Sequence, residues 1–216
     1  MSYVPINYKT WVRSGTGKNI RLTQKEREIW DDALSFQDSR PNDRGHAEVV
    51  AYFALKLLEI GADRNVVLPA AILHDIGWSQ VSVDFRKMFK DPYHPDFAKV
   101  NNPEMRRLHQ KESVRLAIGI LADCEWPKRY HAAILGIVGD HDTRDNFTSL
   151  EAHVMGDADR LWRFTAIECE NYGWKPQDFI AKRKADLAQP TYLLTEAGRR
   201  IAEIELKNTE AYFRHG

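Results

Sequence analysis

The chain has 216 residues, 43% of them hydrophobic, which is enough for one sizeable buried core. Its 31 basic and 31 acidic side chains balance, so we expect no broad electrostatic capture of a nucleic acid polymer or of an anionic membrane. Two cysteines are too few for a disulfide framework. No apolar run approaches the roughly 20 residues of a membrane span, and the first residues do not open a signal peptide. A cytoplasmic protein is therefore expected.

Helix signals begin near residue 23. The pattern Thr23-x-x-Glu26 predicts a capping box that opens a helix to about Phe36. Asn42 is the expected cap of a second helix, which carries apolar residues at helical spacing and ends at Gly61.

Later helix starts carry proline or capping signals. They are expected in the turn around Pro69, at Asn102-Pro103, at Trp126-Pro127 and at a second capping pattern, Thr148-x-x-Glu151, whose helix runs to about Glu170. Two more helices are expected over residues 176–188 and 195–213. Because alternating β-branched runs of strand length are absent, the sequence predicts an all-α bundle.

An imidazole stands beside a carboxylate in the stretch from Ala70 to Gly77, where an apolar run stops at His74-Asp75. An isolated charge is costly in a low dielectric, so this pair must be salt-bridged, hydrogen-bonded or bound to a cation. A helix-terminal His with a capping Asp is the alternative that the dipeptide alone leaves open.

Further metal-binding residue types lie on other predicted helices. They are His46, His109, His141, Asp157 and Asp159. No pair among them has the local spacing of a zinc finger. A metal site that used them would have to be assembled by the fold.

The order of these residues resembles the HD-domain superfamily of metal-dependent phosphohydrolases. Its pattern is a His, then His-Asp after an apolar stretch, often two further His, then an Asp in an Ala-Asp-basic-Leu context, here Ala158 to Leu161. The resemblance covers about residues 42–165. It implies a compact helical bundle of the HD type over residues 23–172, with an extension over 1–22 and C-terminal helices over 173–216 packed on the same domain. The minimal metal ligands that it implies are His46, His74, Asp75 and Asp159.

The last carboxylate has two candidates on one predicted helix. Asp159 shares helical spacing with the apolar Met155 and Trp162, and the motif context also favours it. Asp157 aligns instead with Leu161 and is retained as the second candidate ligand.

His109 and His141 decide between one metal ion and two. With both as ligands, a second ion fits, bridged to the first by Asp75. In the alternative reading, His109 is a polar helix residue that contacts substrate phosphate, and His141 is a cationic helix end favoured by the helix dipole. His131 is the one rival for the fourth His position.

The resemblance implies hydrolysis of a phosphomonoester or phosphodiester, a nucleotide or related small molecule, by attack of a metal-bound hydroxide held at Asp75. His109 or Asp142 is the candidate that protonates the leaving oxygen. Three basic residues near the motifs are candidate phosphate-binding groups, namely Arg44, Lys111 and Arg144.

The ligand types suit one or two divalent transition-metal ions, Mn, Fe, Co, Ni or Zn, and the His count argues against Mg alone. Two other classes of protein use the same scaffold. A di-iron oxygenase has the same His and Asp set, and a metal-free HD-like binding module has typically lost it. The expected partner is a small-molecule phosphate ester, and the sequence leaves a homodimer open.

Overall fold

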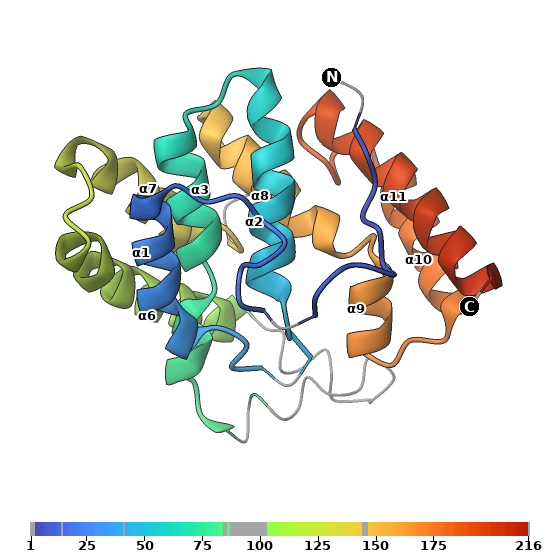
Figure 1. Cartoon of the computed structure of the whole chain (residues 1–216), viewed down its shortest axis with the longest axis horizontal. Coiled ribbons are helices and arrows are strands. Elements are labelled where there is room, and N and C mark those ends of the chain that lie inside the picture. The colour runs from blue at the N-terminus through green and yellow to red at the C-terminus, as the bar shows by residue number, and fades with distance from the viewer. Residues whose placement is uncertain are drawn as a thin grey trace.

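The computed structural model describes residues 3–13, 15–40, 42–83, 86, 103–143 and 147–215, and in these ranges it contains nine α-helices and no strand (Figure 1). The all-α prediction is confirmed. The helices are α1 (Gln24–Ala33), α2 (His46–Leu57), α3 (Arg64–Leu73), α6 (Pro103–Asp123), α7 (His131–Asp140), α8 (Leu150–Trp162), α9 (Ala166–Asn171), α10 (Pro176–Ala188) and α11 (Glu196–His215). Short 3-10 turns cover Leu34–Phe36, Leu58–Ile60, Ile76–Gln80 and Lys128–Tyr130.

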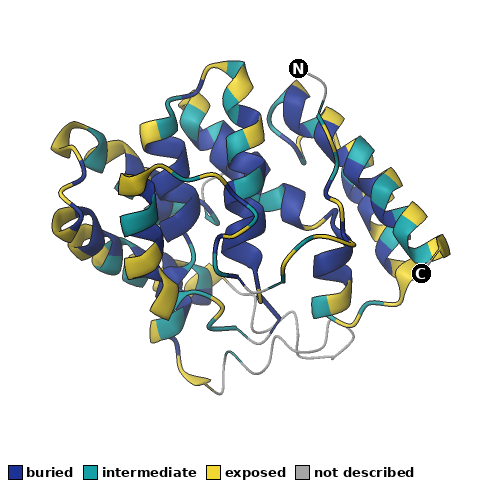
Figure 2. Ribbon diagram, viewed as in Figure 1, coloured by how far each residue is buried: buried dark blue, intermediate teal, exposed yellow. Residues whose placement is uncertain are grey.

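Helix α2 lies at the centre of the molecule and packs against α3 and α8, while α3 also contacts α7 (Figure 1). Helices α1 and α6 lie on one side of this centre, and α10 and α11 lie on the other. Buried residues concentrate in the central helices, whereas the outer helices expose one face (Figure 2). In the part of the chain that the structure describes, each helix is too short or too polar to cross a lipid bilayer.

Helix α2 begins later than the sequence predicts. Gly45, not Asn42, is its N-cap, and His46 is its first residue. The φ of Gly45 is 78°, a left-handed conformation that favours glycine. Its amide donates to the Asp38 carboxylate at 2.9 Å. The chain therefore turns sharply before the helix, and the first imidazole lies at the N-terminal end of α2.

Helix α3 begins at Arg64 with Asp63 as its N-cap, so Pro69 lies in its interior and not in its first turn. A proline there removes the amide that would bond to the carbonyl of Asn65. That carbonyl instead accepts a hydrogen bond from the Trp126 indole at 3.1 Å. Because the orphaned carbonyl has this partner, α3 continues to the turn that carries the His-Asp pair.

The capping predictions had mixed outcomes. The Thr23–Glu26 capping box is confirmed. The second cap is Ser149, whose hydroxyl accepts from the Ala152 amide at 3.1 Å, and not Thr148. The helix expected to reach about residue 170 stops at Trp162, and α9 follows after a turn.

The first residues of the chain bind to the last helix. The Glu205 carboxylate on α11 is buried and accepts hydrogen bonds from the Ile6 amide at 2.7 Å and the Tyr8 hydroxyl at 2.9 Å. Helix α11 also contacts α8. The chain ends thus pack on the central helices, while the domain boundaries at residues 22 and 172 stay predictions.

Candidate metal centre

Two pairs of imidazoles meet, three of the rings at the ends of α2, α3 and α7 and the fourth within α6. The Nε2 atoms of His46, at the start of α2, and His74, just after α3, are 3.0 Å apart. The Nε2 atoms of His109, on α6, and His141, just after α7, are 3.3 Å apart. All four side chains are buried. The structure thus brings together the four His residues that the sequence singled out.

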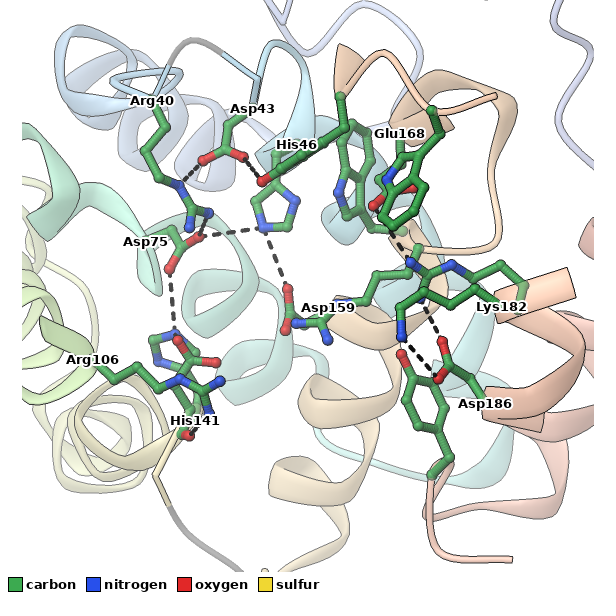
Figure 3. Close-up of a pocket in the computed structure, with 17 residues that line it drawn as sticks. Arg40, Asp43, His46, Asp75, Arg106, His141, Asp159, Glu168, Lys182 and Asp186 are labelled. Carbon is green, nitrogen blue, oxygen red and sulfur yellow. Dashed lines mark hydrogen bonds and ion pairs between the residues drawn. The ribbon is translucent and has the colours of Figure 1, made fainter. Parts of the chain in front are cut away.

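Asp75 lies between the two pairs, and Figure 3 shows its contacts with one member of each, His46 and His141. Its Oδ2 is 3.4 Å from His46 Nε2 and 3.6 Å from His74 Nε2. Its Oδ1 is 3.3 Å from the Nε2 atoms of both His109 and His141. One carboxylate therefore faces both imidazole pairs, with one oxygen for each.

A further carboxylate completes each group. Asp159 Oδ1 lies 3.3 Å from His46 Nε2 and 3.7 Å from His74 Nε2. Asp142 Oδ2 lies 3.4 Å from His109 Nε2 and 3.8 Å from His141 Nε2. We name these groups the first pocket (His46, His74, Asp75 and Asp159) and the second pocket (His109, His141, Asp75 and Asp142).

The hydrogen bonds of the rings test whether the pockets suit a cation. The Nδ1 atoms of His74, His109 and His141 donate to main-chain carbonyls in the preceding turn, at 2.9, 3.3 and 2.8 Å. These bonds assign the ring proton to Nδ1 and leave the Nε2 lone pair facing the pocket. In the second pocket two such lone pairs face each other at 3.3 Å, and they repel unless a proton or a metal ion lies between them. In the first pocket the same reasoning assigns only the His74 ring, because His46 Nδ1 has no partner among the described residues. The imidazole and carboxylate donors of each pocket fit a divalent transition-metal ion.

The carboxylates of the first pocket are ionised. Burial raises the pKa of Asp75, but the nearby His74 and Arg40 outweigh it and hold that pKa well below its ordinary value. Burial likewise opposes ionisation of Asp159, but the adjacent imidazoles of His46 and His74 hold its pKa well below the ordinary value. Both side chains can therefore serve as anionic ligands.

Arg40 and Trp78 contact two of the predicted ligands, Asp75 and His109, and help to hold them in position. The Trp78 ring stacks on the His109 ring with 4.2 Å between centroids. The Arg40 guanidinium lies 4.5 Å from the centroid of the same indole and donates to Asp75 Oδ2 at 2.9 Å. Arg40 also forms an ion pair with Asp43. Sequence reasoning missed Arg40, although it lies only six residues before His46.

The second candidate for the last carboxylate, Asp157, lies apart from the four imidazoles. Asp157 is fully buried and accepts hydrogen bonds from the amides of Leu194 at 2.6 Å and Thr195 at 2.8 Å. Its carboxylate thus satisfies free amides at the start of α11 and lies in neither pocket. His131, the alternative for the fourth histidine, is engaged elsewhere: its Nε2 bonds to the carbonyl of Trp126 at 2.8 Å.

A cavity of about 330 Å³ opens onto both pockets. Arg44 and Lys111, predicted as phosphate-binding groups, are exposed and do not line this cavity. Arg144 lies outside the described residues. The cationic side chains that do line the cavity are Arg40, Arg106, Arg163, Lys182 and Arg183.

A comparison with protein families matches the HD domain model to residues 44–163, more than half of the chain. The chain belongs to the HD-domain superfamily of metal-dependent phosphohydrolases. The matched part of this HD domain contains every residue of the two pockets. Helices α10 and α11 lie outside it, although α10 contributes to the cavity wall. Comparison with curated proteins found no match, and neither did comparison with solved structures.

Proposed function

We propose that this HD domain hydrolyses a small phosphomonoester or phosphodiester with two divalent metal ions, one in each pocket. The observation that carries the proposal is Asp75, whose two oxygens face separate imidazole pairs at 3.3–3.6 Å. A carboxylate in this position bridges two cations. Mixed imidazole and carboxylate ligands favour Mn, Fe, Co, Ni or Zn.

Divalent ions held by the residues of the two pockets would supply a hydroxide nucleophile at neutral pH and would neutralise charge on the phosphoryl oxygens. Side chains of the cavity wall would bind and orient the substrate for that chemistry. Arg106 donates to the main-chain carbonyl of Asp142 at 3.3 Å and lines the cavity beside the second pocket. Its guanidinium is therefore placed to bind phosphoryl oxygens in the groove next to the ions.

We assign Asp142 to the second pocket as a ligand. Its Oδ2 faces the same two nitrogen atoms as Asp75 Oδ1. A carboxylate that holds a cation is ionised and has no proton to give. Asp142 is therefore better suited to metal binding than to protonation of the leaving oxygen.

The cavity indicates the size of the substrate. Its volume of about 330 Å³ is at the small end of the range of about 300–1,000 Å³ that is usual for small-molecule sites. Aromatic side chains of Trp162, Tyr172 and Trp174 line it, which suits a ring in the substrate. A nucleotide or related small molecule fits these features, and a nucleic acid polymer does not.

A di-iron oxygenase is the second candidate, because four imidazoles and a bridging carboxylate also suit two iron ions. The arginine and lysine side chains in the cavity wall favour a phosphate substrate and hence hydrolysis. A metal-free binding module is the third candidate, and the complete ligand set argues against it.

Phosphate release without oxygen separates these candidates. Apo protein reloaded with Mn²⁺ under anaerobic conditions should release phosphate from a member of a panel of nucleoside monophosphates, sugar phosphates and phosphodiesters. The His74→Ala variant should be inactive, and the matched His131→Ala variant should stay active. No release from any member by the Mn²⁺ form, with oxygen uptake by the iron form, would overturn the hydrolase proposal in favour of the oxygenase.

A further inference from the structure

The far wall of the cavity comes from helices that follow the matched HD region. Glu168 lies on α9, and Lys182 and Asp186 lie on α10. In Figure 3 these three residues lie across the pocket from Asp75 and the imidazoles. A substrate whose phosphoryl group lies at the metal pockets therefore extends its other end towards this wall.

Most of the charge in the wall is already compensated. Arg183 is only 3% exposed and donates to Asp186 Oδ2 at 2.6 Å. Its other terminal nitrogen lies 3.8 Å from Glu168 Oε1. Arg183 thus has nearby carboxylates on two helices and acts as a fixed part of the wall.

Lys182 retains an available positive charge. Its side chain is 50% exposed, and its only described carboxylate contact is Asp186 Oδ1 at 3.6 Å. That carboxylate already accepts the shorter bond from Arg183. Burial raises the pKa of Glu168 to about 7, so this acid carries only part of a negative charge at neutral pH.

Arg163 also lines the cavity, but Tyr192, Asp159 and Asp142 act electrostatically on its guanidinium, so its charge is directed towards the metal side of the cavity. On the far wall Lys182 and Arg183 share the Asp186 carboxylate, and the half-exposed Lys182 ammonium has the longer contact of the two. A weakly compensated cation of this kind attracts an anion.

We propose that Lys182 binds a second anionic group of the substrate at the end remote from the metal pockets. The substrate class is then a small phosphate ester that also carries a carboxylate or a second phosphate. The inference rests on the proposed function for the position of the phosphoryl group. It goes beyond that function in naming the second charge and the residue that recognises it.

Helix α10 provides a matched control. Lys184 lies two residues after Lys182, and therefore on another side of the helix. Its ammonium forms an ion pair with Glu210 at 2.6 Å, and it does not line the cavity. Replacing either lysine by Met removes one charge from an exposed position of the same helix.

The test uses phosphonates, because a phosphoesterase does not cleave their C–P bond. Carboxyalkyl phosphonates with two to five methylene groups are compared with alkyl phosphonates of the same length, by calorimetric titration of Mn²⁺-loaded protein. At the length that spans the cavity, the carboxylated member should bind about tenfold more tightly than its alkyl partner. Lys182→Met should remove this preference, Lys182→Glu should reverse it, and Lys184→Met should leave it unchanged.

Equal binding of both series at every length would overturn the proposal, as would a preference that survives Lys182→Met or a failure of every member to bind. The result is independent of turnover. Phosphate release by a protein that binds both phosphonate series equally would contradict the proposed second-anion site, but not the proposed hydrolysis. A Lys182-dependent preference in a protein that hydrolyses no ester would support binding of a second anionic group by Lys182 and would contradict the proposed hydrolysis.

Discussion

The indole of Trp78 stacks on the imidazole of His109, with 4.2 Å between the ring centroids and 13° between the ring planes. The stack covers one face of a ligand of the second pocket. The orientation of His109 therefore depends on a residue in the 3-10 turn that follows Asp75.

Trp78→Leu should loosen His109 and weaken binding of the second metal ion by about tenfold, since partners of metal ligands typically contribute that much or more. The first ion should be retained. Trp78→Phe keeps an aromatic face and should bind nearly as tightly as the wild type. Titration with Mn²⁺, followed by calorimetry, measures both affinities. Equal loss of both ions in Trp78→Leu would show that the indole supports the whole fold rather than His109.

Substitutions of the two α8 aspartates should have different effects, one on metal binding and the other on stability. Asp159→Asn removes an anionic ligand of the first pocket, so bound metal should fall while stability changes little. Asp157→Ala leaves the amides of Leu194 and Thr195 without their acceptor, and the free energy of unfolding should fall by about 2 kcal/mol. Metal analysis and urea denaturation of both variants check this. A metal loss in Asp157→Ala at full stability would reverse the assignment.

The choice between Asp157 and Asp159 on α8 shows how much of the site the sequence can predict. Asp159 was favoured because it shares spacing with Trp162, and both residues line the cavity. Asp157 is buried as well, so burial alone does not separate the two. Its partners, Leu194 and Thr195, lie more than 30 residues away, and no local pattern reveals such a pairing.

The predicted phosphate-binding residues Arg44 and Lys111 lie outside the cavity, because closeness in sequence does not set the direction of a side chain. Lys111 lies two residues after His109 on one helix, about 200° around its axis, and so faces solvent. Arg44 precedes the left-handed turn at Gly45 and is exposed. Lys182 reaches the cavity only through the packing of α10, for which the sequence carries no local signal.

Asp142→Asn should weaken the second pocket selectively. The change removes a negative charge 3.4 Å from His109 Nε2, and the second ion should bind at least tenfold more weakly, as expected for loss of an anionic ligand. Asp140→Asn, two residues earlier on α7, is the matched control and should bind both ions normally. Unchanged metal content together with a lost basic or acidic limb in the pH–rate profile of Asp142→Asn would instead assign Asp142 to proton transfer.

Glu26 should make stability depend on pH. Burial raises its pKa, but hydrogen bonds from Arg64 at 2.6 and 2.8 Å outweigh burial and lower the pKa below the ordinary value of 4.5. A lowered folded-state pKa stabilises the fold above pH 4.5, and this contribution is lost as the pH falls through the folded-state value.

Glu26→Gln should therefore lower the free energy of unfolding at pH 7 by about 1 kcal/mol, and the difference from wild type should shrink below pH 4.5. Glu28→Gln, which removes an exposed ion pair with Lys25 at 3.2 Å, should have little effect. Urea denaturation over this pH range measures both variants. A constant difference across the range would assign the effect to packing rather than to charge.

The central claim is that Asp75 joins two cation pockets. Anomalous diffraction from crystals grown with Mn²⁺ tests it most directly. The account predicts two peaks, one among His46, His74 and Asp159 and one among His109, His141 and Asp142, with an oxygen of Asp75 beside each. A single peak, or Mn²⁺ found only at surface carboxylates, would contradict it.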